Sequence, residues 1–287
     1  MTKLVPDNVL IDGNRIAYGI HGDGEPLVLI HGTPFFSHIW RRVLPVLVDS
    51  GYRVHVYDLL GFGNSERPRD RSVDTSVSGQ LPVLTELMNY WELESSHIVA
   101  HDIGGAVAQQ LGIYNQERIR TLTLIDTVSF DSWPSKRTRE QMAAGLDNLI
   151  AASDAEHLRH FREWIFSAAF DHDNLRSGPL DTYLDMISGP VGQASLFQHQ
   201  IMHYDPEHTA QLTDKLHELG KLPVQLVWGA DDQWQVTDWA HKLNAAIPGS
   251  SLHILEQCGH LVPEDQPEEL SKLILQHLRN DQCRLTA

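Results

Sequence analysis

Short apolar runs that alternate with longer helix-like segments are the feature that most constrains the fold of this chain. Each run is rich in β-branched residues and ends at a turn, as buried strands do; the runs cover residues 26–31, 53–58, 97–100, 121–125, 224–228 and 251–255. Helical periodicity is found at residues 39–50, 76–91, 105–115, 239–246 and 267–278. Because strands that alternate with helices form parallel sheets covered on both faces, we predict an α/β fold with a mostly parallel sheet. A hairpin over residues 8–19, turning at Asp12 and Gly13, is expected to lead into this sheet.

One long segment, residues 132–219, interrupts this alternation. It shows no strand pattern, only helix-like stretches at residues 137–152, 154–169 and 180–204. An all-helical insertion at this point of the chain is interpreted as a cap over the sheet rather than as an independent domain. We therefore predict a core built from residues 1–131 and 220–287, with residues 132–219 as a helical cap, or lid, over the active site.

Charge and hydropathy exclude several classes of function. The 287 residues carry 22 Lys and Arg against 38 Asp and Glu, a formal net charge of −16, so no nucleic-acid partner is expected, because a polyanion needs a basic surface. No window approaches the roughly 18 consecutive apolar residues of a membrane span, and residues 1–7 do not resemble a signal peptide. We thus expect a cytoplasmic protein with no membrane partner. Cys258 and Cys283 are expected to be free thiols, since two cysteines cannot form a disulfide framework.

The most informative motif lies at residues 98–105, Ile-Val-Ala-His-Asp-Ile-Gly-Gly. A β run enters a sharp turn and leaves as a helix, with Asp102 at the corner, which is the pattern of a nucleophile elbow. The usual pattern is Gly-x-Ser-x-Gly, and here Ala100 replaces the first Gly and Asp102 replaces Ser. A carboxylate at the corner attacks saturated carbon and forms an ester of the enzyme, so that a halide or a ring-opened alkoxide leaves. The alternative is an aspartate that merely caps the helix.

Two further motifs supply groups that would act with Asp102. The turn at residues 31–34, His-Gly-Thr-Pro, follows a predicted strand and would aim the backbone N–H of Thr33 at the space over Asp102. Together with the N–H of Ile103, this donor would form an oxyanion hole. His260 lies in a loop after the last predicted strand, where a histidine can act as the base that deprotonates water.

A catalytic histidine also needs an acid that orients it. Asp232 follows the predicted strand at residues 224–228 with the spacing Gly-x-x-Asp, and we favour it as the acid. Asp126, which ends the predicted strand at residues 121–125, is the competing position.

Together these motifs resemble the α/β-hydrolase superfamily over nearly the whole chain. The resemblance is carried by the motifs at residues 31–34, 57–65, 101–105, 229–232 and 259–260. It implies the α/β-hydrolase fold, with Asp102, Asp232 and His260 in the superfamily's order of nucleophile, acid and base. The aspartate at the elbow is similar to the epoxide hydrolase and haloalkane dehalogenase branch, which implies an aspartyl ester intermediate and no cofactor.

The sequence also departs from both members of that branch. Haloalkane dehalogenases usually hold the halide with a Trp after the nucleophile and an Asn in the His-Gly-Asn-Pro turn, positions taken here by Ile103 and Thr33. Haloacetate dehalogenases typically place an Arg after the nucleophile, and epoxide hydrolases often a Trp. Epoxide hydrolases also use two cap tyrosines to protonate the opening ring, and Tyr183 and Tyr204 are the available candidates, although each is equally consistent with packing.

We therefore expect a cofactor-independent hydrolase that acts on a small, largely apolar epoxide and on water, with a homodimer as a possible assembly. Substrate contacts are expected from His31, Trp133, Trp164, Tyr183 and Tyr204. No metal is expected, because the helically spaced histidines 157 and 160, and 199 and 203, have no third ligand nearby in sequence and are interpreted as solvated helix faces. The alternatives are a dehalogenase whose halide site comes from Trp133 or Trp164, an esterase-like or non-hydrolytic acid/base enzyme, and a ligand-binding protein on a hydrolase scaffold.

Overall fold

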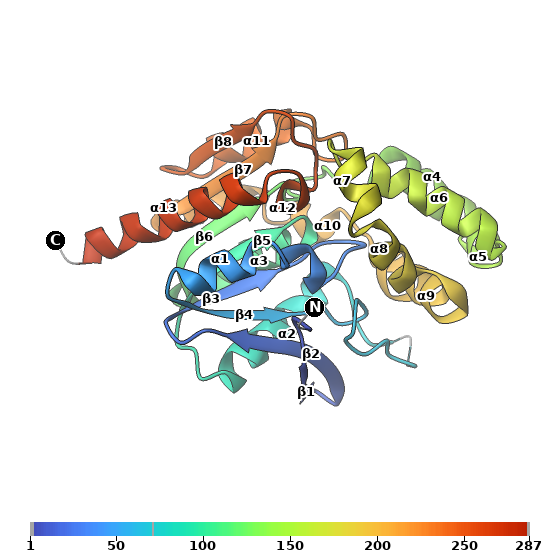
Figure 1. The fold of residues 1–287 in the computed structure, drawn as a ribbon, viewed down its shortest axis with the longest axis horizontal. Helices are drawn as coiled ribbons and strands as arrows, with labels where there is room; N and C mark the ends of the chain where they lie inside the picture. The colour runs from blue at the N-terminus through green and yellow to red at the C-terminus, as the bar shows by residue number, and fades with distance from the viewer. Residues whose placement is uncertain (1–2, 71, 286–287) are drawn as a thin grey trace.

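A computed structural model describes residues 3–70 and 72–285, and these residues form one sheet with helices on both faces and a helical layer at one end (Figure 1). The strand order is β1-β2-β4-β3-β5-β6-β7-β8. The strands are β1 (Asp7–Ile11), β2 (Asn14–His21), β3 (Glu25–Ile30), β4 (Tyr52–Tyr57), β5 (Ser96–His101), β6 (Ile119–Ile125), β7 (Val224–Gly229) and β8 (Ser251–Leu255). From β4 to β8 the neighbours in the sheet pair in parallel, whereas β2 is antiparallel to both β1 and β4. The predicted α/β fold with a mostly parallel sheet is confirmed.

Helices α1 (Leu44–Asp49) and α13 (Pro267–Leu285) lie together on one face of the sheet, and α2 (Val77–Tyr90), α3 (Ile103–Tyr114) and α11 (Thr237–Ala246) cover the other. Burial on both faces explains why the central strands read as continuous apolar runs. The single helix expected over residues 39–50 is instead a 3-10 turn, η1 (Ser37–Trp40), followed by α1. Pro45 lies in the first turn of α1, where its missing N–H costs nothing, and it could not have continued a helix from η1.

All regular structure between β6 and β7 is helical, and it lies beyond the carboxyl ends of the parallel strands, on the right in Figure 1. This layer contains α4 (Lys136–Ala144), α5 (Asp147–Ile150), α6 (Asp154–Phe166), α7 (His172–Ser177), α8 (Leu180–Ile187), α9 (Gly189–Ser195), η3 (Leu196–Gln200), η4 (Ile201–His203), α10 (Glu207–Ala210) and η5 (Thr213–Lys221). We refer to it as the cap.

Two long helices predicted in the cap are broken in the structure. The stretch at residues 137–152 divides at Gly145, which has a φ of +88° and ends α4. The stretch at residues 180–204 divides at Ser188, whose backbone is extended, and α9 then begins at Gly189, with a φ of +67° and Pro190 in the first turn. Helix α7, which the sequence analysis missed, begins where the Asp171 side chain accepts the N–H of Asn174.

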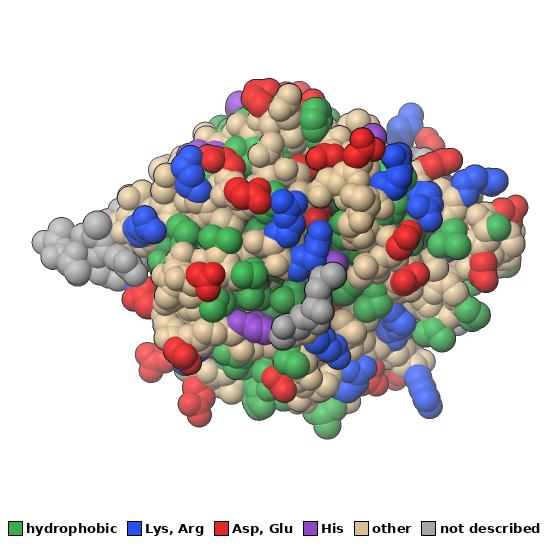
Figure 2. Space-filling model, in the orientation of Figure 1, with side chains coloured by type: hydrophobic (Ala, Val, Ile, Leu, Met, Phe, Trp, Pro, Cys, Tyr) green, Lys and Arg blue, Asp and Glu red, His purple; other side chains and the backbone are tan. Residues whose placement is uncertain are grey.

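Acidic and basic side chains are interspersed over the face shown in Figure 2. Among the described residues, no helix is both long and apolar enough to cross a membrane. Cys258 is buried with a free thiol, and the side chain of Cys283 lies outside the described part of the chain.

Candidate active site

Asp102 stands at the corner between β5 and α3, with φ of 54° and ψ of −123°. A left-handed φ of this kind costs an aspartate about 1–3 kcal/mol, so the surrounding structure must hold it. Its backbone N–H donates to the carbonyl of Ile125 (3.1 Å), and its carbonyl accepts the N–H of Gly105 (3.0 Å). Any side chain on Gly32 would overlap the Asp102 carboxyl group, which explains why glycine is required there.

The two carboxylate oxygens of Asp102 have different neighbours. Oδ1 accepts the backbone N–H of Thr33 at 2.7 Å. Oδ2 lies 3.5 Å from Nε2 of His260, an ion-pair separation. One oxygen is therefore held by a backbone donor, while the other faces a titratable base.

His260 and Asp232 lie in the loops after β8 and β7, and both are buried. Nδ1 of His260 donates to Oδ2 of Asp232 at 2.9 Å. The other oxygen of Asp232 accepts the N–H groups of Trp234 (2.7 Å) and Gln235 (2.9 Å), which fixes the carboxylate. The structure thus brings Asp102, His260 and Asp232 into one line of contacts, with His260 between the two carboxylates.

The contacts among Asp102, His260 and Asp232 shift the pKa values of His260 and Asp102. Burial alone would lower the pKa of His260, but the negative charge of Asp232 and the contacts with Asp102 raise it well above its ordinary value. Burial alone would raise the pKa of Asp102, but the interaction with His260 and its charge lower it below its ordinary value. Both shifts favour an ionised Asp102 carboxylate beside a protonated His260.

Asp126, the competing acid, follows β6 and is fully buried. Its Oδ1 accepts the N–H of Gly229 at 2.9 Å, whereas Nδ1 of His260 points at Asp232. Oxygen and nitrogen atoms of Asp126, Asp232 and His260 lie within 4.8 Å of one another, close enough for a metal ion. A metal would have to displace the Nδ1 proton that His260 donates to Asp232, so this arrangement fits an acid–base pair better than a ligand set.

A cavity of about 230 Å³ opens above Asp102 between the core and the cap. Its walls combine three tryptophans and a tyrosine with several polar side chains; the residues are Thr33, Asp102, Val128, Trp133, Pro134, Ser135, Thr138, Trp164, Ser167, Tyr204, Gln233, Trp234 and Gln235. The indole N–H groups of Trp133 and Trp234 are already donated, to Thr209 (3.0 Å) and Ser167 (2.9 Å). These two indoles therefore offer the cavity their ring surfaces rather than a donor.

Trp234 is a site residue that the sequence analysis missed. Its ring stacks on Trp164 of the cap (4.7 Å between centroids) and lies 4.9 Å from the ring of His260. Its position two residues after Asp232, in the same loop, is the signal that could have identified it.

Of the two candidate tyrosines, Tyr204 lines the cavity and its hydroxyl bonds to that of Thr33. Burial raises the pKa of Tyr204, so its phenol stays protonated. Tyr183 is placed elsewhere, which corrects our expectation: its ring packs edge-on against Phe35 (5.0 Å) and its hydroxyl donates to Glu264. It joins α8 to the core because Glu264 belongs to α12 (Val262–Asp265).

The expectation that His31 contacts substrate also needs correction. Nδ1 of His31 donates to the carbonyl of Gly32, and Nε2 accepts the N–H of Leu59, both at 2.9 Å. With both ring nitrogens engaged by backbone, the buried imidazole supports the turn that carries Thr33.

The helical histidines are not a solvated face as expected. His157 and His199 are both buried, and Nε2 of His157 bonds to the carbonyl of Ile187 at 2.7 Å. His157 is fully occupied in packing because its ring also lies against Phe161, 4.5 Å between centroids.

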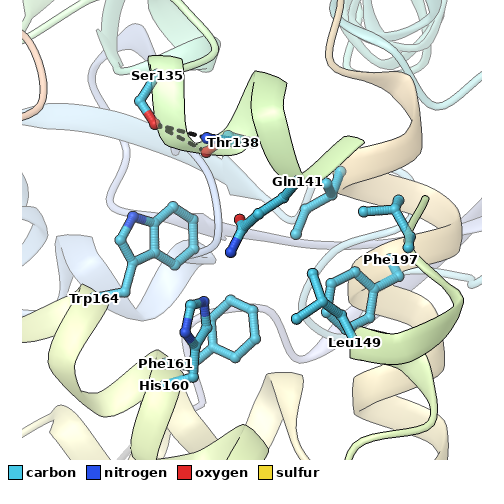
Figure 3. A pocket seen from close by; sticks show the side chains of 10 residues that line it. Ser135, Thr138, Gln141, Leu149, His160, Phe161, Trp164 and Phe197 are labelled. Carbon is cyan, nitrogen blue, oxygen red and sulfur yellow. Dashed lines mark hydrogen bonds between the residues drawn. The ribbon is translucent and has the colours of Figure 1, made fainter. Parts of the chain in front are cut away.

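A second, smaller chamber lies inside the cap, beyond Trp164 (Figure 3). Its volume is about 30 Å³, room for about one water molecule. Phe161 and Phe197 form much of its wall, and Figure 3 shows the Gln141 amide pointing into it. Ser135, Thr138 and Trp164 line both this chamber and the cavity over Asp102, and Trp164 has the largest side chain of the three.

Comparison with known proteins agrees with this architecture. Residues 27–273 match the model of the alpha/beta hydrolase family. A crystal structure of an alpha/beta hydrolase fold protein from Burkholderia ambifaria is 30% identical, with a TM-score of 0.85 over 96% of this chain and 98% of that chain. The fold class predicted from the sequence is thereby confirmed.

Two characterised relatives are more distant. A soluble epoxide hydrolase from a Corynebacterium species is 25% identical over 93% of this chain and 94% of the relative. A cis-3-alkyl-4-alkyloxetan-2-one decarboxylase from Shewanella oneidensis is 24% identical over 90% of this chain and 83% of the relative.

Proposed function

Because the chain belongs to the alpha/beta hydrolase family, we propose that it is a hydrolase that works through a covalent ester on Asp102, with a small epoxide as its substrate. The observation that carries the proposal is the division of labour between the two oxygens of Asp102. Oδ1 accepts the N–H of Thr33, a donor of the expected oxyanion hole, and Oδ2 lies 3.5 Å from Nε2 of His260, the expected base. A serine at this corner could not fill both positions, whereas a carboxylate does.

In the first step, Oδ2 of Asp102 attacks a ring carbon of the epoxide, and the carbon–oxygen bond of the ring breaks. The released oxygen takes a proton from the hydroxyl of Tyr204, which is the tyrosine that lines the cavity. The aromatic walls would hold the apolar part of the substrate during this attack.

In the second step, the ester itself switches His260 into a base. Ester formation removes the negative charge of Asp102, which is one of the groups that raise the pKa of His260. The imidazolium then releases its proton, which returns through solvent to the Tyr204 phenolate left by the first step, and the neutral ring, oriented by Asp232, takes a proton from water. Hydroxide attacks Cγ of Asp102, and the N–H groups of Thr33 and Ile103 would stabilise the oxyanion on Oδ1. Collapse expels the alkoxide, which takes the proton of the newly formed Asp102 carboxyl group and leaves as the diol.

Two relatives support a strained oxygen ring as the electrophile, since one is named for an epoxide and the other for an oxetan-2-one. The dehalogenase alternative is weaker, because the indole N–H groups of Trp133 and Trp234 are already bonded within the protein. Trp164 is then the remaining indole of the cavity that could serve a halide.

The test is intact-mass spectrometry of His260→Ala incubated separately with epoxide, oxetan-2-one and haloalkane panels, because loss of the base should trap the ester. We expect a mass gain equal to a whole epoxide, mapped to Asp102, and no gain in the double variant His260→Ala/Asp102→Asn. A gain of the alkyl group alone would identify a dehalogenase instead. No adduct on the folded variant would overturn the aspartyl-ester proposal and favour the acid/base or ligand-binding alternatives.

A further inference from the structure

Asp126 lies beside the proposed triad, where a negative charge on its carboxyl group would be unfavourable. It follows β6, and Asp232 follows β7, its parallel neighbour in the sheet, so the two carboxyl groups emerge side by side. Oδ1 of Asp126 accepts the N–H of Gly229, but Oδ2 is buried and no N–H or hydroxyl of the described residues reaches it. A buried carboxylate oxygen left without a donor is costly, so the structure calls for a proton at this point.

Asp232 shows the opposite situation. One of its oxygens accepts two backbone N–H groups and the other accepts Nδ1–H of His260, so three donors stabilise Asp232 as a carboxylate anion. Atoms of Asp126 and Asp232 that could bind a common partner lie within 4.8 Å of each other. Two buried carboxyl groups at this separation cannot both be ionised without strong repulsion.

The cation beside Asp126 and Asp232 is His260, which already interacts with two carboxylates. The single positive charge of His260 is shared between Asp232, at 2.9 Å, and Asp102, at 3.5 Å. A third carboxylate would leave an uncompensated buried negative charge, which is strongly destabilising. The thiol of Cys258 also lies near, and its pKa is raised by burial and by Asp126, so it stays neutral and offers no charge.

We propose that Asp126 is a neutral carboxylic acid whose O–H donates a hydrogen bond to the carboxylate of Asp232, and that it thereby positions the residue that orients His260. The bond satisfies the lone Oδ2 of Asp126 and adds a donor to Asp232 without adding charge. The backbone of Asp126 has a φ of 42°, a left-handed value that persists only where the surrounding structure holds it. The position of this residue beside Asp232 is therefore fixed by the fold. Burial and the charge of Asp232 raise the pKa of Asp126 well above its ordinary value, which agrees with the assignment.

Infrared spectroscopy tests the protonation state without any substrate. A protonated carboxyl group has a C=O stretching band at higher frequency than a carboxylate, and this band shifts in D2O. At neutral pH the wild-type protein should show such a band, and Asp126→Asn should lose it. The matched control is Asp58→Asn, since Asp58 is a buried aspartate after β4 whose two oxygens accept three N–H donors, from Ser37 and Asn64. This control should keep the band.

Equal spectra for the wild type and Asp126→Asn would overturn the proposal. If Asp126→Asn does not fold, NMR of wild-type protein labelled with ¹³C at the aspartate carboxyl carbon answers the same question. A carboxyl carbon that keeps the chemical shift of the protonated form at neutral pH is expected. A spectrum in which every aspartate has the ionised shift would refute the assignment.

Kinetics test the positioning role, and this arm rests on the proposed function. Asp126→Ala leaves Asp232 without the donor and should lower kcat about 10-fold, as loss of one buried hydrogen bond does. Asp126→Asn restores an N–H donor and should recover most of that loss. Asp232→Asn should cost on the order of 10³–10⁴-fold, as removal of a triad acid does. A larger loss in Asp126→Asn than in Asp232→Asn would make Asp126 the triad acid and sink the proposal. Absence of turnover in every protein would count against the proposed function alone, because the infrared arm needs no substrate.

Discussion

At the scale of single residues, the charge of Asp102 controls the protonation of its neighbour. The contacts with Asp102 help to raise the pKa of His260, so the Asp102→Asn variant should have a lower His260 pKa than the wild type. This variant copies the charge lost when the ester forms. NMR titration of the histidine ring, assigned by comparison with His260→Ala, measures the effect directly. An unchanged His260 pKa would mean that ester formation cannot convert the imidazolium into a base.

The two cap tyrosines offer a matched pair of substitutions. Tyr204→Phe removes the acid that protonates the opening ring, so kcat for epoxides should fall by about 10²–10⁴-fold. Tyr183→Phe removes a hydroxyl that donates to Glu264 outside the cavity, so it should lower thermal stability and leave kcat close to that of the wild type. Steady-state kinetics and melting curves of both variants separate these effects. Equal kcat losses in the two variants would contradict the assignment of Tyr204.

These residues also show how far the sequence predicts the site. Asp102, Asp232 and His260 were identified because each follows a strand, and parallel strands bring their carboxyl ends to one edge of a sheet. Tyr183 could not be placed in the same way. Whether a cap residue faces the cavity or the core depends on how helices pack across the chain, and no local pattern records that packing.

At the scale of elements, the same contrast separates the core from the cap. The six predicted parallel strands all exist, and the central ones are continuous apolar runs because they are buried in the sheet interior. The cap helices were predicted too long, because their periodicity continues through Gly145 and Ser188 while their backbones do not. A glycine at a positive φ, or a residue with extended backbone, ends a helix without changing the hydrophobic pattern, so periodicity alone overestimates helix length.

At the same scale, we expect Trp164 of α6 to limit substrate size, since it is the largest of the three side chains that line both the cavity over Asp102 and the chamber in the cap. Trp164→Ala should join the two spaces and raise kcat/KM for epoxides that carry a bulkier apolar group, relative to small ones. A panel of epoxides with increasing chain length measures the change in preference. Phe166→Ala is the control, because Phe166 lies on the same helix and lines neither space. An identical shift in both variants would indicate loosening of α6 instead.

At the scale of the whole molecule, a buried ion pair ties the cap to the core. Glu264 is fully buried and accepts Nη2 of Arg41 at 2.7 Å, while its other oxygen accepts the Tyr183 hydroxyl from the cap. Glu264→Gln should leave the half-buried Arg41 without its counter-charge and cost about 3–5 kcal/mol in the free energy of unfolding. Chemical denaturation measures this loss. Glu268→Gln is the control, because its exposed pair with Arg42 should contribute little. Similar losses in both variants would argue against a special role for the buried pair.

The pH dependence of global stability follows from the same buried groups, and Asp126 and Asp102 should show opposite signs. The pKa of Asp126 is raised in the folded state. Below its ordinary value of 3.8 the carboxyl is protonated in both the folded and the unfolded state, so this group does not make stability depend on pH there. As pH rises above that value, the unfolded chain releases the proton first and the wild type loses stability until the folded pKa is reached. Asp126→Asn has no such proton, so its melting temperature relative to the wild type should rise between about pH 4 and pH 8. The pKa of Asp102 is lowered, so the wild type loses stability as pH falls through it, and the relative melting temperature of Asp102→Asn should rise toward low pH. Melting curves of the three proteins, measured from below pH 3.8 up to neutral pH, test both predictions. Parallel curves for Asp126→Asn and the wild type would mean that Asp126 ionises normally in the folded protein.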